Sequence, residues 1–182
     1  MIRRIFLAAA LSLFSLAAAA QSLTTAQLQT LKTYINTVPA WSALPNDSNN
    51  ALTIAAGLNA PASPAFIGWR SNVSADEIGN AWVGTDIDGM SALNMQRLQL
   101  LLQSSRSGQF DMGRSDRRAG FENPFGTNAN NASRVAMRAS WKRSATVAEK
   151  VLATGTGSDA SPANFGWEGT LTYSDVQTAR SQ

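Results

Sequence analysis

Two reactive side chains are missing from this 182-residue chain, which contains neither cysteine nor histidine. Their absence excludes a Ser-His-Asp triad, a Cys-His pair, a zinc site of the usual kind and a histidine-ligated haem. Disulfide bonds are excluded as well. Any catalysis would therefore depend on carboxylates, hydroxyls, lysine or tyrosine.

Charged residues are also scarce. They make up 15% of the chain, against about 25% in a typical domain. The surface is therefore expected to consist largely of Ser, Thr, Asn, Gln and Ala, a composition suited to neutral contact surfaces. With 44% hydrophobic residues, the chain can form one domain with a substantial core. The sequence contains only four glutamates: Glu77, Glu122, Glu149 and Glu168.

Residues 1–20 have the pattern of a secretory signal peptide, with Arg3 and Arg4 before the apolar run 5–16 and small residues at 18–20. The apolar run is short for a membrane span. The alternative is an N-terminal helix that docks on the domain or on a partner. Removal of the segment would leave 13 basic against 12 acidic residues, a net charge of +1. So small an excess is no evidence for nucleic-acid binding, which needs a clustered basic field.

Apolar residues at helical spacing dominate residues 21–154 and predict a mainly α fold, with a single helical-bundle domain. Thr24 and Gln27 have the spacing of a capping box, and so do Ser74 and Glu77. The first two helices are expected to form an antiparallel hairpin, and the fourth is expected to be largely buried. The helices are predicted over 24–38, 46–59, 74–83, 91–102 and 131–154.

A polar segment rich in Gly, Asn and Arg, residues 104–131, interrupts the helical pattern. It is predicted to be a long loop, and its length suggests that it is functional or ordered by a partner.

Residues 155–182 differ in character and predict an extended C-terminal arm, jointed by glycines, with a short β-strand and a short terminal helix. Phe165, Trp167, Leu171 and Tyr173 alternate with polar or small residues, which is the period of a strand with one apolar face. Since no partner strand is evident in the chain, we expect this face to bind another subunit. Truncation of the arm should then leave the melting temperature unchanged and abolish only assembly.

Three local patterns suggest chemistry but are better explained by ordinary structure. Residues 154–158 (TGTGS) follow a helix and lack the lysine of a phosphate loop. Residues 86–89 (DIDG) lack the later ligands of a calcium loop and predict an Asp-Gly turn. Glu168 stands beside Trp167, but on a strand the two side chains point to opposite faces, which predicts a solvated carboxylate. We therefore expect no catalytic residue, no metal and no cofactor.

A basic stripe is the remaining electrostatic feature. Arg134, Arg138 and Lys142 lie four residues apart on the helix predicted over 131–154. Such a stripe indicates either a solvated helix face or a contact with an acidic protein surface or with DNA.

Three stretches are distinctive as sequence patterns: LTTAQLQTLK (23–32), APASPAFIGWR (60–70) and KRSATVAEKVLATGTGSDASPANFGWEGTLTYSDV (142–176). They resemble a group of small uncharacterised proteins encoded in the structural-gene clusters of tailed bacteriophages and prophages of Proteobacteria. Such proteins normally begin near the position of Ser22, so the segment before it is an addition here. The resemblance implies a virion structural protein and carries over no catalytic residue.

The sequence thus predicts a non-enzymatic phage virion subunit, most specifically a head-tail connector or neck (adaptor) protein. It would form a cyclic homo-oligomer in the host cytoplasm, bind portal or tail subunits and have no small-molecule substrate. The signal-like segment favours a different class, an exported periplasmic or secreted binding module or a carboxylate-based cell-wall hydrolase. The residues predicted to make the interaction are Phe165, Trp167, Leu171, Tyr173, Arg134, Arg138 and Lys142.

Overall fold

The computed structural model describes residues 22–105 and 107–182. The signal-like segment 1–20 lies outside this part of the chain. The described residues form ten α-helices, one 3₁₀ helix and five short strands, which confirms the prediction of a mainly α protein.

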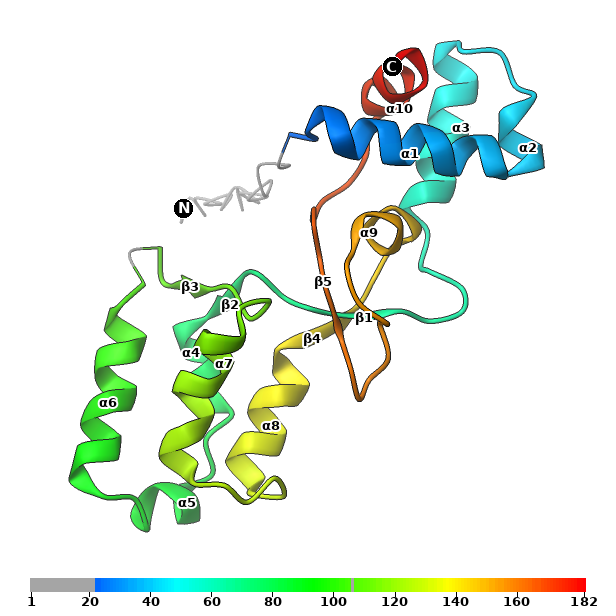
Figure 1. The fold of residues 1–182 in the computed structure, drawn as a ribbon. Coiled ribbons are helices and arrows are strands. Elements are labelled where there is room, and N and C mark those ends of the chain that lie inside the picture. The colour runs from blue at the N-terminus through cyan, green and yellow to red at the C-terminus, as the bar shows by residue number, and fades with distance from the viewer. Residues whose placement is uncertain (1–21, 106) are drawn as a thin grey trace, which may run out of the picture.

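Two groups of helices lie on either side of a small central sheet (Figure 1). The helices are α1 (Thr25–Thr37), α2 (Pro39–Ser42), α3 (Ser48–Asn59), α4 (Ala75–Asn80), α5 (Gly84–Asp88), α6 (Ala92–Gln103), α7 (Ser115–Glu122), η1 (Asn123–Phe125), α8 (Ala132–Ser140), α9 (Val147–Leu152) and α10 (Tyr173–Ser181). The strands are β1 (Ile67–Trp69), β2 (Val73–Ser74), β3 (Gln109–Phe110), β4 (Lys142–Ser144) and β5 (Ala163–Asn164).

The first group contains α1, α2, α3, α9 and α10 and has its own apolar cluster. Leu31 and Ile35 of α1 and Ile54 and Leu58 of α3 are completely or almost completely buried in it. The C-terminal helix α10 packs against both α1 and α3. The prediction of a direct hairpin does not describe this group, because the short helix α2 follows α1 in the chain and α10 contacts both α1 and α3.

The central sheet has the strand order β4-β1-β5, with β4 antiparallel and β5 parallel to β1. Gly68, at the centre of β1, pairs with Arg143 on one side and Ala163 on the other. A Cβ atom at Gly68 would lie 2.2 Å from the ring of Phe165. The sheet therefore brings the ring of Phe165 against the backbone of β1, and this close approach requires glycine.

The second group, α4 to α8, surrounds a separate apolar cluster closed by the small sheet of β2 and β3. The rings of Phe110 and Phe121 meet edge to face, with centroids 5.1 Å apart. The described part of the chain thus has two apolar clusters. The buried members of this cluster are Val73, Ile78, Leu98, Phe110, Met112, Phe121, Met137 and Trp141.

Local signals located the starts of several helices correctly. Thr24 and Gln27 cap α1 reciprocally, and Ser74 and Glu77 do the same for α4. The fourth predicted helix corresponds to α6, but Leu98 is its only buried residue, so the prediction of a largely buried helix was wrong.

The single helix predicted over 131–154 does not exist. The structure places α8, the strand β4 and α9 in its place. Strand β4 leaves the helical path to pair with β1, and Thr146 then starts α9 through a capping box with Glu149. This box has the usual spacing in the sequence, but the apolar residues on either side also fit one continuous helix.

The loop predicted over 104–131 is also largely structured, since it contains β3, α7 and η1. Its isolated aromatic residues Phe110 and Phe121 are buried in the second cluster. These two rings therefore pack against residues that are far away in the same chain.

The C-terminal arm does not protrude. Only Ala163 and Asn164 form strand, and α10 begins at Tyr173, so the strand predicted over 165–173 is absent. The backbone of Leu171 pairs with the side chain of Asn59 and not with a neighbouring strand. The amide nitrogen of Asn59 donates to the carbonyl of Leu171, and its amide oxygen accepts from the Leu171 N–H, both at 2.9 Å. This side chain satisfies backbone groups that a ladder would otherwise have to pair.

Candidate functional site

The four arm residues predicted to bind a partner do not form one exposed face. Trp167 and Leu171 are buried in the first apolar cluster, and Phe165 is half-buried under the guanidinium of Arg143, 4.4 Å from its ring centroid. Tyr173 alone is exposed, with 48% of its surface accessible. The arm therefore packs on its own chain, which corrects the expectation that it is a dispensable binding element.

The predicted basic stripe is also not a free surface. Arg134 and Arg138 both bind Glu122 of α7, with donor–acceptor distances of 2.6 to 2.9 Å. Burial alone would raise the pKa of Glu122, but the hydrogen bonds and charges of Arg138 and Arg134 outweigh it and hold the pKa below its ordinary value. These two arginines link α7 to α8 through Glu122, and Arg138 also lines the cavity described below.

Lys142, the third residue of the stripe, lies on β4 and points toward the turn before β5. Its Nζ donates to the backbone oxygen and the carboxylate of Asp159, at 3.0 and 2.8 Å. The side chain of Asp159 is 84% exposed, so this ion pair sits at the solvent boundary. The three predicted cations thus have carboxylate partners within the chain.

A second arginine-centred cluster, absent from the sequence prediction, holds the arm in place. Arg143 of β4 binds both Glu149 of α9 and Glu168 of the arm, and Glu168 also accepts from the backbone N–H of Ser71 at 3.0 Å. Burial opposes the charge on Arg143, yet the two carboxylates raise its pKa above the ordinary value. Glu168 is therefore an ion-pair partner, and the prediction of a solvated strand carboxylate was wrong.

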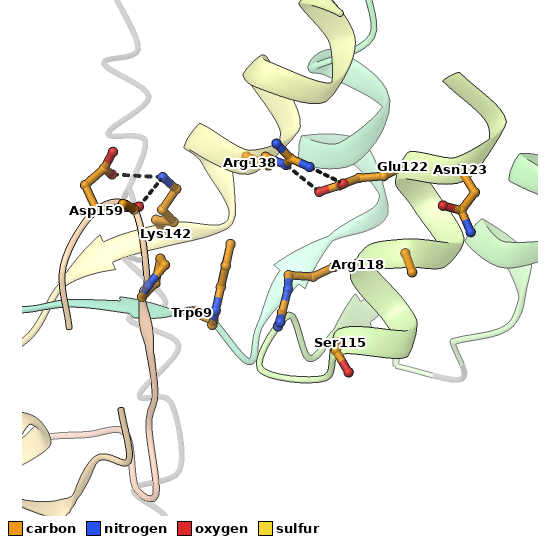
Figure 2. A pocket seen from close by; sticks show the side chains of 11 residues that line it. Trp69, Ser115, Arg118, Glu122, Asn123, Arg138, Lys142 and Asp159 are labelled. Carbon is orange, nitrogen blue, oxygen red and sulfur yellow. Dashed lines mark hydrogen bonds and ion pairs between the residues drawn. The ribbon is translucent and has the colours of Figure 1, made fainter. Parts of the chain in front are cut away.

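A cavity of about 610 Å³ lies where α7, α8 and β4 face the turn before β5 (Figure 2). Figure 2 shows Trp69 and Arg118 side by side, with the Arg138–Glu122 and Lys142–Asp159 pairs above them. The volume falls within the range of about 300–1,000 Å³ typical of ligand sites. The lining residues are Trp69, Ser115, Arg118, Ala119, Glu122, Asn123, Arg138, Lys142, Asp159, Ala160 and Pro162.

Arg118 differs from the other cations of the cavity. Its Nη1 donates to the carbonyls of Met112 and Gly113, and its guanidinium lies 4.3 Å from the centroid of the Trp69 ring. Within residues 22–105 and 107–182, no carboxylate lies within ion-pair distance of it, and its Nε and Nη2 have no acceptor. Burial lowers the pKa of Arg118, and the charges of Glu122 and Asp111 offset this only in part. Arg118 is thus an oriented cation that has no ion-pair partner among the described residues.

The chemistry available in the cavity is recognition of an anion. Ser115 carries the only hydroxyl group among the lining residues. Activation of a serine needs a base such as a free lysine or a histidine. The lysine of the lining, Lys142, is paired with Asp159, and the chain contains no histidine. Among the described residues, no group of three or more Asp or Glu side chains is placed to hold a metal ion. The sequence prediction named Arg138 and Lys142 of this lining as interaction residues but did not join them to Trp69 and α7, which come from distant parts of the chain.

A separate apolar surface lies on α6. Leu93 and Leu100, seven residues apart and therefore on one side of the helix, are 58% and 60% exposed. Leu100 also lines a shallow groove of about 310 Å³ between α6 and the segment around Pro124. On α3, in the other group of helices, Leu52 is exposed to a similar extent.

Comparison of the chain with protein-family models, curated proteins and solved structures gives no match. In the part of the chain that the structure describes, no helix is both long enough and apolar enough to cross a membrane.

Proposed function

We propose that this chain is a non-enzymatic structural subunit of a phage virion, a head-tail connector or neck protein that docks on the portal ring. The sequence resemblance of residues 23–32, 60–70 and 142–176 to phage structural proteins is the starting point. The role would be assembly, with other virion proteins as partners and a cyclic homo-oligomer as the working form.

The observation that carries the non-enzymatic part of the proposal is the pairing of the glutamates. All four are bound by arginine: Glu77 by Arg70, Glu122 by Arg134 and Arg138, and both Glu149 and Glu168 by Arg143. A glycosidase-type acid must instead be held protonated in an apolar pocket. The pairing supports a structural use of these carboxylates.

The exposed leucines support assembly. Leu52 on α3 and the pair Leu93 and Leu100 on α6 lie in different groups of helices. A head-to-tail ring is built from two different surfaces on each subunit, and exposed leucines on two different groups of helices fit that requirement. Exposed apolar patches on a soluble chain are typical of protein contacts.

Light scattering of residues 22–182, alone and with purified portal rings, tests the proposal. We expect an oligomer or a portal complex, and Leu100→Glu should weaken it because a charge would enter the apolar contact. Thr53→Glu places the same charge on α3, next to the exposed Leu52. It should weaken the complex only where Leu52 is part of the contact. A strict monomer that ignores the portal would refute the proposal.

A second candidate is an exported binding module, and the observation that favours it is the signal-like segment 1–20. Fractionation of the producing cell and sequencing of the mature N-terminus discriminates the two. A chain that begins at Gln21 in the periplasm favours export. A chain that retains residues 1–20, or begins at a later internal start, and is found in the cytoplasm or in particles favours the virion.

A further inference from the structure

We propose that the cavity around Arg118 is a carboxylate-binding site that takes an aspartate or glutamate side chain from an acidic segment of a partner subunit. The assignment rests on the proposed assembly role and names the chemistry of one of its contacts.

The first support is the geometry of Arg118. The carbonyls of Met112 and Gly113 hold one edge of its guanidinium, and the indole of Trp69 holds its plane. The Nε–Nη2 edge is left without an acceptor among the described residues. This edge is the fork that binds a carboxylate through two parallel hydrogen bonds. An arginine fixed in this way loses little side-chain entropy when an anion binds.

The second support is the balance of charge. The lining holds three cations, Arg118, Arg138 and Lys142, and two carboxylates, Glu122 and Asp159. A single negative charge is attracted on balance. A phosphate monoester carries about −1.5 to −2 charges, and its second charge would face Glu122 and Asp159. Just outside the lining, Arg134 binds Glu122 and the carboxylate of Asp111 acts on Arg118, so counting both leaves the same excess of one positive charge.

The third support comes from Asp159. Its carboxylate reaches Lys142 at 2.8 Å while the side chain remains 84% exposed. Asp159 thus shows that a largely exposed carboxylate can be held by a cation of this lining. The exposed rim also indicates a side chain inserted by a partner, because sites for small molecules usually bury about 70–90% of the ligand surface.

An NMR titration of the full-length, isotope-labelled chain tests the assignment. The probe is an acetylated and amidated peptide of alternating glycine and glutamate, and its control is the same peptide with glutamine. We expect the glutamate peptide to shift the Arg118 Nε–H and Trp69 indole N–H signals and to bind about tenfold or more tightly than the glutamine peptide.

Variants locate the effect. Arg118→Gln should weaken binding of the glutamate peptide about tenfold. Arg117→Gln removes the same charge one residue away, where the guanidinium donates to Ser104 outside the cavity, and should leave the affinity nearly unchanged. If Arg118→Gln fails to fold, Arg118→Lys keeps the charge but loses the fork, and should give an intermediate loss.

Several outcomes would overturn the assignment. Equal effects of the Arg117 and Arg118 variants would show a diffuse charge effect. Tighter binding of inorganic phosphate than of the peptide would favour a phosphoryl ligand, and equal binding of free succinate would favour a small carboxylate. A chain that binds portal rings but not the peptide refutes this site alone. A chain that binds the peptide but remains a monomer without affinity for the portal refutes the assembly role alone.

Discussion

Replacement of Trp167 by alanine tests whether the C-terminal arm belongs to the core. Trp167 is 2% exposed and lies in the cluster formed by α1, α3, α9 and α10. A buried aromatic side chain removes about 150–250 Å² from water, which at about 25 cal/mol per Å² corresponds to about 4–6 kcal/mol. Alanine retains part of this burial, so we expect a loss of about 4 kcal/mol, within the range of about 3–5 kcal/mol for large aromatic-to-alanine changes.

Urea unfolding followed by far-ultraviolet circular dichroism measures this loss. With a slope of about 2 kcal/mol per molar urea, the midpoint should fall by about 2 M. The matched control is Tyr173→Ala, six residues along the same arm, where the side chain is 48% exposed and the expected loss is below about 1 kcal/mol. Hydrogen exchange should show that α1 and α10 lose protection before α7 and α8. A Trp167→Ala chain with an unchanged midpoint would show that the arm is separable from the core.

Three further substitutions probe the ion pairs and the close contacts. Glu149→Gln should destabilise the chain by about 1–3 kcal/mol at neutral pH, because Arg143 loses one of its two carboxylate partners and keeps Glu168, and urea midpoints measure it. Burial is the largest single influence on the pKa of Glu149 and would raise it. The combined effect of Arg143 and the Thr146 backbone exceeds that of burial and holds the pKa below its ordinary value. The stabilising contribution of Glu149 is therefore fully present above the unfolded pKa of 4.5 and is lost as the pH falls through the lower folded pKa. The stabilities of wild type and Glu149→Gln should thus converge in acid. A difference in stability that stays constant with pH would contradict this. Gly68→Ala should cost about 1–3 kcal/mol, because the new methyl group displaces Phe165; melting temperatures test it, with Gly79→Ala, where nothing lies within 4 Å of the added atom, as the control. Asn59→Ala should cost about 1–3 kcal/mol through the unpaired backbone of Leu171, and a chain as stable as wild type would show that water replaces the amide.

Local signals in this sequence predicted local structure well. The capping boxes at Thr24 and Ser74 require only residues three positions apart, and both helices begin where these boxes place them. The capping box at Thr146 has the same spacing. The apolar residues around it fit one continuous helix, so the sequence did not predict β4, which separates α8 from α9. Periodicity alone does not exclude a three-residue strand whose partner, β1, lies far away in the sequence.

The arm could not be predicted because its partner is a side chain. Alternation from Phe165 to Tyr173 predicted a strand in need of a neighbour, and the correct part of that reasoning was that the backbone needs hydrogen bonds. Asn59, which is 112 positions from Leu171, supplies both hydrogen bonds of the Leu171 backbone. No sequence pattern marks an asparagine at the end of a helix as the substitute for a strand, so the arm was wrongly predicted to protrude.

The low charge content of the chain makes the unpaired charge of Arg118 important for the electrostatics of the cavity. The glutamates are bound within the chain by Arg70, Arg134, Arg138 and Arg143. These ion pairs join segments of the fold and contribute little to the outer field, since each pairs opposite charges at short range. An arginine that is oriented but has no carboxylate partner therefore dominates its surroundings more than it would on a densely charged surface. Arg118 is in this position, and for that reason the electrostatic specificity of the chain is expected at its cavity, which Arg138 and Lys142 of the predicted stripe also line.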